Sequence, residues 1–363
     1  MANITAAMVK ELRELTGAGM MDCKKALGET DGDMDAAVDF LKKSGAAKAE
    51  KKASRIAAEG ICRVAMFENK KAVVAEVNSE TDFVAKNEVF QEFVQAVADT
   101  ALASGLNGGK NGEDVETLLD KDGLRELVVE KTAKIGEKLS VRRFVRVEGD
   151  LVVSYLHGGG RIGVLVSAKC AEATDAVKEA LQNIAMQVAA MSPEYLKESD
   201  ISDAEKAKML DITTDSALND PASLPKPILQ KLIDKAIADK KWNDETVSIY
   251  EDKKSNMNFL FNFLPEEAKT ALIELAMADK DSIVNDKIFE GLVKGRIAKR
   301  EKEVVLLNQV YVRAEDGKQS VAKYLESVDK SLEIEKFVRF EVGEGMEKKN
   351  EDFAAEVAAQ MNA

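Results

Sequence analysis

A β-hairpin pattern followed by helix patterns and a closing strand occurs twice in this 363-residue chain, and this repeat constrains the fold more than any other feature. Short apolar runs joined by turn residues predict the hairpins, and apolar residues spaced three or four apart predict the helices. In the first copy the strands are expected at 61–67, 72–77 and 139–147, and the helices at 88–103 and 115–134, with a mobile loop at 105–112. In the second copy the strands are expected at 151–156, 162–168 and 337–343, where 337–343 echoes 144–149, and the helix at 175–190. The sequence therefore predicts an α+β fold with two duplicated core subdomains.

The first 55 residues carry a helical pattern without strands. Thr5 is a candidate N-cap for a first helix, and Gly17-Ala18-Gly19 ends it before a second helix. Asp33 is a candidate cap for a third helix that stops near Ser44-Gly45. The alanine- and lysine-rich stretch 46–58 has no apolar stripe, so we interpret it as a partly helical linker. Three helices of this length predict a small bundle.

The second copy of the core is interrupted by a long helical insertion. All five prolines lie in or beside residues 193–303, where the pattern is otherwise helical. Phe259, Phe261 and Phe263 within it allow two interpretations, the core of a helical hairpin or an exposed patch for self-association. A last short helix is expected at 352–360. The domains predicted in this way are a bundle at 1–55, a first core subdomain at 56–148, a second at 149–195 plus 303–345, an insertion at 196–302, and a C-terminal module at 346–363.

Charge and reactive residues narrow the classes of function. The 52 basic and 65 acidic residues give a net charge of −13, which disfavours binding to nucleic-acid phosphate. The three cysteines are far apart, so neither a disulfide framework nor a zinc site is expected. The single histidine, His157, and the absence of a G-x-S-x-G motif argue against a catalytic triad. The start lacks a signal-peptide pattern and no apolar run is long enough to span a membrane, so we expect a cytoplasmic protein.

Three motifs resemble ligand sites but lack the context that such sites need. Gly158-x-Gly160-x-x-Gly163 matches the dinucleotide fingerprint, yet it leads into a strand and not a helix, so we expect a hairpin turn with positive φ. Gly108-Gly109-Lys110 lacks the first glycine and the final Ser or Thr of a phosphate loop. The acidic residues at 31, 33 and 35 lack the glycine and closing glutamate of a calcium loop.

Two segments and one side chain are not well explained by folding alone. Met20 and Met21 are adjacent at a helix start, so both cannot point inward, and methionine suits adaptable protein contacts. Phe83, within Thr81-Asp82-Phe83-Val84, is either a staple on the core or a projecting aromatic anchor. His157 is either a polar turn residue or a contact.

Four sequence blocks together resemble the elongation factor Ts family. They are the segment 16–27, the segment 77–86 with Thr81-Asp82-Phe83-Val84, Arg161-Ile162-Gly163-Val164-Leu165-Val166, and Phe340-Glu341-Val342-Gly343-Glu344-Gly345. The resemblance spans about residues 1–195 and 290–363, and the blocks occur in the family's order. The insertion is longer than expected for the family.

The resemblance implies a guanine-nucleotide exchange factor for elongation factor Tu. In this family the N-terminal bundle is similar to ubiquitin-associated domains and docks on the GTPase domain through residues matching Leu12, Met20 and Met21. The resemblance makes Thr81, Asp82, Phe83 and Val84 the exchange element, in which Phe83 wedges between partner helices and GDP is released. It implies further contacts by His157 and by the C-terminal helix.

The same resemblance implies that the chain holds no cofactor or metal of its own, because GDP and magnesium belong to the partner. It implies no nucleic acid or membrane, and it leaves open a homodimer that would give a 2:2 complex. Two other classes remain from the residues themselves. One is an enzyme that binds a nucleotide at the 158–163 turn, and the other is a non-catalytic interaction or assembly module.

Overall fold

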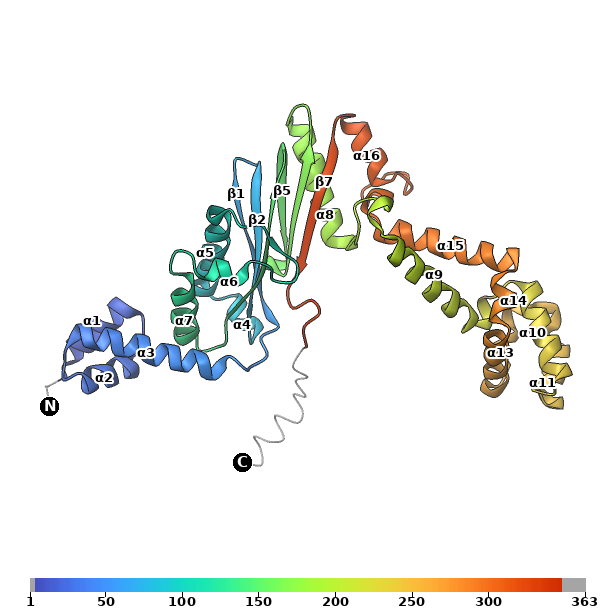
Figure 1. Cartoon of the computed structure of the whole chain (residues 1–363), viewed down its shortest axis with the longest axis horizontal. Helices are drawn as coiled ribbons and strands as arrows, with labels where there is room; N and C mark the ends of the chain where they lie inside the picture. Colours follow the sequence, from blue (N-terminus) through green and yellow to red (C-terminus); the bar gives the residue numbers. More distant parts are fainter. Residues whose placement is uncertain (1–3, 348–363) are drawn as a thin grey trace. The chain divides into compact units, whose positions relative to one another are not determined.

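The computed structural model describes residues 4–347, and contacts within the chain divide it into two compact units (Figure 1). One unit comprises Pro193–Ala322 and the other the remainder of the chain. The independent unit therefore extends beyond the predicted insertion, 196–302, at both ends. Helices and strands are both abundant, which confirms the α+β class. Within residues 4–347 every helix is too short or too polar to cross a membrane.

The chain begins with a three-helix bundle. Thr5 and Asp33 cap its first and third helices as predicted, with Met8 N–H 3.3 Å from Thr5 Oγ1 and Ala36 N–H 2.9 Å from Asp33 Oδ1. The prediction that the third helix stops near Gly45 is wrong, because the helix continues through the alanine-rich stretch, where helix propensity is high. Gly45 is buried within this third helix, at a contact with Ala133 of α7 (Leu124–Ile135). The helices are α1 (Ala6–Thr16), α2 (Met20–Glu29) and α3 (Met34–Lys52).

The first sheet has the strand order β1-β2-β4-β3, and its strands are antiparallel. Two predictions in this subdomain need correction. The expected helix at 115–134 is broken, because Asp122 and Gly123 adopt positive φ, and part of the expected loop at 105–112 pairs with β4 as a two-residue strand. The strands are β1 (Glu59–Phe67), β2 (Lys71–Ser79), β3 (Gly108–Gly109) and β4 (Ser140–Glu148), and the helices are α4 (Asp82–Ala85), α5 (Glu88–Ser104), α6 (Val115–Leu119) and α7 (Leu124–Ile135).

The second sheet repeats the same order of hairpin, helix and closing strand. Its order is β5-β6-β7, and α8 packs on β5 and β6 as α5 packs on β1 and β2. Both sheets contain a bulge in the closing strand at the equivalent place: β4 has an extra residue opposite Glu76 and Val77 of β2, and β7 has one opposite Ser167 and Ala168 of β6. These shared features support the predicted duplication. The elements are β5 (Leu151–His157), β6 (Ile162–Lys169), α8 (Asp175–Met191), α16 (Val321–Val328) and β7 (Glu333–Glu341).

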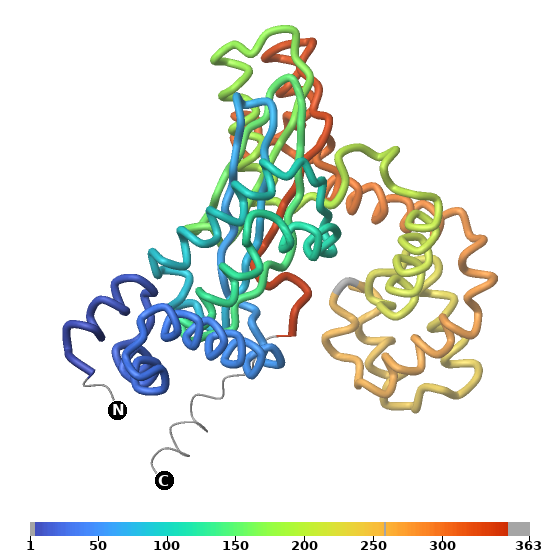
Figure 2. Tube along the Cα trace, turned by 60° about the vertical axis from the view of Figure 1, so that its left-hand side comes forward, coloured from blue at the N-terminus to red at the C-terminus, as the bar shows by residue number. Residues whose placement is uncertain are grey.

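The two sheets pack face to face, so four layers form (Figures 1 and 2). Alternate residues of β1 and β2 divide between two cores: Ile61 and Val73 face α5, whereas Cys62 and Val74 face the second sheet. Gly163 allows this close approach, because a Cβ there would lie 2.8 Å from both Cys62 Cβ and Val74 Cγ2. This packing fixes the two sheets relative to each other, and the candidate site lies at one end of them.

Thiol reactivity tests this packing. Burial between the sheets raises the pKa of the Cys62 thiol, and Cys23 is buried in the bundle, whereas Cys170 is partly exposed. Because the thiolate is the reactive form, we expect Ellman's reagent to modify Cys170 first in the native protein and all three cysteines after unfolding. Rapid native modification of Cys62 would contradict the face-to-face arrangement.

The unit Pro193–Ala322 is helical and has its own hydrophobic core. Trp242 lies in that core and donates a hydrogen bond to the Ala268 carbonyl at 3.0 Å. Phe261 packs against the core, but Phe259 and Phe263 are mostly exposed, so a core role is wrong for those two. The helices are α9 (Asp203–Leu218), α10 (Lys226–Ala238), α11 (Asp244–Lys253), α12 (Met257–Leu260), α13 (Glu266–Ala278), α14 (Lys280–Val284) and α15 (Lys287–Val304). The helix expected at 352–360 lies outside the described residues.

Candidate functional site

Phe83 projects from α4, the single helical turn that follows β2. Its side chain is 78% exposed, so it is not a staple on the core. Val84 beside it is buried in the core between the first sheet and α5, and Asp82 is exposed. The turn is therefore anchored through Val84, and it presents an acidic and an aromatic side chain to the surroundings.

Two carboxylates hold the start of this turn. Glu137 accepts hydrogen bonds from the Thr81 backbone N–H at 2.9 Å and from Thr81 Oγ1 at 2.7 Å. Glu80 accepts a hydrogen bond from the Lys138 backbone N–H at 2.6 Å. Thr81 is the N-cap residue of α4 but its side chain caps no helical N–H, because it is directed to Glu137. Glu137 was not predicted, and nothing in the local sequence around it marks such a contact.

The bundle exposes both methionines that the sequence singled out. Met20 is 60% exposed and Met21 is 73% exposed, at the start of α2. Leu12, expected on the same docking surface, is instead completely buried between the bundle helices. Its side chain supports the bundle, so we leave it out of the exposed surface.

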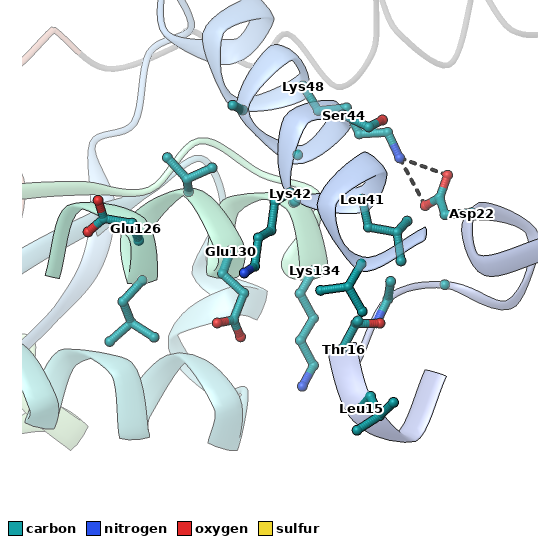
Figure 3. Close-up of a pocket in the computed structure, with 18 of the residues that line it drawn as sticks. Leu15, Thr16, Asp22, Leu41, Lys42, Ser44, Lys48, Glu126, Glu130 and Lys134 are labelled. Atoms are coloured by element: carbon teal, nitrogen blue, oxygen red, sulfur yellow. Dashed lines mark hydrogen bonds and ion pairs between the residues drawn. The ribbon is translucent and has the colours of Figure 1, made fainter. Parts of the chain in front are cut away.

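A cavity of about 740 Å³ lies between the bundle and α7 (Figure 3). Apolar side chains from both sides line it, including Leu15, Leu41 and Leu127. Lys48 and Asp22 form an ion pair at one side, with Nζ 2.9 Å from Oδ1. The described lining residues include neither histidine nor cysteine. The cavity therefore offers an apolar surface flanked by charged side chains, and its described lining lacks the imidazole or thiol of a nucleophilic catalytic site.

His157 ends β5 and leads into the glycine turn. The Tyr155 hydroxyl lies 3.0 Å from His157 Nδ1, and the imidazole is exposed. Gly158, Gly159 and Gly160 all have positive φ and join β5 to β6, which confirms the hairpin interpretation and excludes the strand-to-helix geometry of a dinucleotide motif.

The His157 turn and the Phe83 segment lie at the same end of the two sheets. Arg161, just after the turn, forms an ion pair with Glu59 of β1, with Nη1 3.5 Å from Oε2. Glu59 is the register partner of Ser79, from which the chain leads directly to Thr81. The structure thus places the His157 turn and the Phe83 segment at one end of the two sheets, whereas Met20 and Met21 lie on the bundle.

A buried ion cluster stabilises the same part of the core. Glu76 of β2 is completely buried, and its carboxylate accepts hydrogen bonds from Arg142 Nη1 at 2.8 Å and Arg143 Nε at 2.6 Å. The bulge in β4 explains how two consecutive arginines reach one carboxylate, because successive side chains of a regular strand point to opposite faces. The Gly343 N–H also donates to Glu76, at 2.9 Å, so the cluster fixes the chain after β7. In the sequence, the only sign of this cluster is that Glu76 is a charged residue within an otherwise apolar strand.

Known proteins match almost the whole chain. A sequence model described as Elongation factor TS matches residues 80–250 and 262–344. Elongation factor Ts of Clostridioides difficile (strain 630) is 42% identical over 371 residues, covering 99% of this chain and 100% of the relative. The chain belongs to the elongation factor Ts family. Elongation factor Ts of Clostridium novyi (strain NT) is 39% identical over 373 residues, and that of Aliarcobacter butzleri (strain RM4018) is 37% identical over 376 residues, each covering 99% of both chains.

Membership in the elongation factor Ts family bears on the role of the chain and on its insertion. The chain is a translation elongation factor, as its relatives are named. The family model also covers most of the predicted insertion, 196–302, and leaves residues 251–261 within it unmatched. The exposed Phe259 lies in that short unmatched segment.

Proposed function

We propose that this chain is the guanine-nucleotide exchange factor of elongation factor Tu. It binds the GDP-bound partner, disturbs the magnesium and phosphate site, and promotes GDP release. The observation that supports this most is Phe83, a large apolar side chain held out from the core on an anchored turn beside Asp82. Exposed aromatic anchors of this kind contribute much of the binding energy at protein interfaces.

Exchange needs a wedge and a docking surface, and no chemical step. GDP and its magnesium ion are bound to the GTPase by charge contacts that tolerate little displacement. A protein that binds the nucleotide-free GTPase more tightly than the GDP form weakens GDP binding by the same factor. The chain would therefore act without a cofactor, metal or catalytic residue of its own, because GDP and magnesium belong to the partner.

The docking surface that we propose combines the bundle with the sheet end. Met20 and Met21 supply flexible apolar contacts on the bundle, and His157 supplies a polar contact at the same sheet end as Phe83. Non-catalytic assembly is the second candidate, since Phe259 and Phe263 are exposed on the helical unit and could join two copies. Only the first candidate changes the rate at which GDP leaves its partner.

Release of fluorescent GDP from purified elongation factor Tu, measured in the presence of unlabelled GDP, tests the proposal. We expect the rate of release to rise with the concentration of this chain and to reach a plateau. A rate that stays at the intrinsic value, while another exchange factor accelerates the same preparation, would leave assembly as the better explanation.

A further inference from the structure

Two loops at the base of α4 are cross-linked by a reciprocal pair of carboxylates. The loop after β2 contributes Glu80 and Thr81, and the loop between α7 and β4 contributes Glu137 and Lys138. Glu137 accepts from the Thr81 N–H at 2.9 Å, and Glu80 accepts from the Lys138 N–H at 2.6 Å. Each loop thus supplies one carboxylate and one backbone donor to the other, and together the four residues form a clamp. Such charge-assisted bonds are among the stronger ones in proteins.

The segment that follows α3 is held to the same two loops. Arg55 Nη1 lies 3.2 Å from Glu80 Oε2, and Lys138 Nζ donates to the Arg55 carbonyl at 2.9 Å. Lys52, the last residue of α3, donates to the Gly136 carbonyl. The cations of this group offset the two carboxylates, and they tie the end of the bundle's last helix to the base of the Phe83 turn.

This arrangement matters because α4 has little stability of its own. It has only four residues, and one helical turn is unstable in isolation. Its buried contact is Val84, on the side of the turn directed to the core. With only that contact the turn could tilt, whereas the two bonds from Thr81 to Glu137 fix where the turn begins. A wedge held in one orientation loses less conformational freedom when it inserts into a partner.

We propose that Glu137, assisted by Glu80, is a positioning residue for nucleotide exchange, which holds Thr81 so that Phe83 meets the partner in a fixed orientation. The inference rests on the proposed exchange function. Glu137 itself need not touch the partner, because it acts through Thr81.

The test compares Glu137→Ala and Thr81→Val with Glu137→Gln in the GDP-release assay. Alanine removes both bonds to Thr81, and we expect the maximal release rate at saturating exchange factor to fall about 10-fold, as for the loss of hydrogen bonds to a charged group. The half-saturating concentration should change by about twofold or less, since the methionine surface is untouched.

Glu137→Gln should restore most of the rate, because the glutamine oxygen can accept from the Thr81 N–H. Thr81→Val should lower the rate too, and combining it with Glu137→Ala should add little.

A second readout does not depend on the partner. Hydrogen exchange at the Thr81 amide should speed up by about 10-fold in Glu137→Ala and remain near wild type in Glu137→Gln. Glu92→Ala is the matched control, because Glu92 is an exposed carboxylate on the neighbouring α5 and lies outside the cavity at the bundle. It should change neither the release rate nor the Thr81 amide.

The outcomes separate this inference from the proposed function. If wild type accelerates release and Glu137→Ala does so equally well, the positioning role is overturned and the exchange function stands. The positioning role is also overturned if Glu137→Gln lowers the release rate as much as Glu137→Ala does while the circular dichroism of Glu137→Gln matches wild type. If wild type itself fails to accelerate release, the exchange function is what is lost, and the Thr81 amide still reports on the clamp.

Discussion

Replacing Phe83 by alanine is expected to lower the maximal rate of GDP release by about 30-fold or more. Truncating a central aromatic anchor costs about 2 kcal/mol or more of interface energy, and about 1.4 kcal/mol corresponds to a factor of ten. The fold should be unchanged, because a side chain that is 78% exposed contributes little to the core. Stopped-flow measurement of fluorescent GDP release, beside far-ultraviolet circular dichroism, checks both parts.

Phe67→Ala provides the matched control for this variant. Phe67 is also an exposed phenylalanine of the first sheet, but it lies at the opposite end of β1 from Glu59, beside the hairpin turn. We expect it to exchange GDP at the wild-type rate. Equal rates for the two variants would show that Phe83 is an ordinary surface residue, and an unfolded Phe83→Ala protein would show that its side chain serves the core.

Replacing Glu76 by alanine is expected to destabilise the sheet-containing unit by about 3–5 kcal/mol. Removing one partner of a buried ion pair leaves the other charge without compensation, and here Arg143 is buried beside it. The loss should be larger than that from a single surface pair, because Arg142, Arg143 and the Gly343 N–H all lose the same acceptor. Loss of the carboxylate also removes the acceptor of the Gly343 N–H, one of the bonds that hold the chain after β7.

The two units allow this loss to be measured with an internal reference. Trp242, the single tryptophan, lies in the core of the helical unit, so its fluorescence follows that unit alone. Modification of Cys62 follows the contact between the two sheets. In urea, Glu76→Ala should move the Cys62 transition to lower concentration and leave the Trp242 transition in place. Glu116→Ala removes an exposed ion pair with Arg125 in the same unit and should shift neither transition by much. A Glu76→Ala protein that behaves like Glu116→Ala would contradict the structural role of the cluster.

Regular periodicity made most of the core predictable from the sequence. The hairpins 61–77 and 151–168 are short apolar runs joined by turn residues, so their strands and turns were placed within a few residues. The errors arose where a glycine has more than one possible role. Gly45 was expected to end a helix but packs inside one, whereas Gly123, which was expected inside a helix, interrupts it with a positive φ. Tertiary packing decides between these roles.

The site was predictable only where a side chain is unusual for its position. Two adjacent methionines and a phenylalanine beside an aspartate drew attention to residues that prove to be exposed. Leu12 fits an ordinary helical stripe, and its burial agrees with that pattern. Glu137 was missed because its partner, Thr81, is 56 residues away and neither residue is unusual where it stands. Contacts of that kind depend on which loops the topology brings together.

The order of the elements along the chain also affects how the protein can fold as it is made. Ser167 and Lys336, which pair between β6 and β7, are 169 residues apart, with the whole helical unit between them. On the ribosome, β6 therefore lacks its second neighbour until nearly all of the chain has emerged. The helical unit has a separate core, and within it Tyr195 pairs with Val305, so a folded insert holds the ends of this long loop together and lowers the entropy lost on closing it. A substitution that unfolds the insert would then delay completion of a sheet to which the insert contributes no strand.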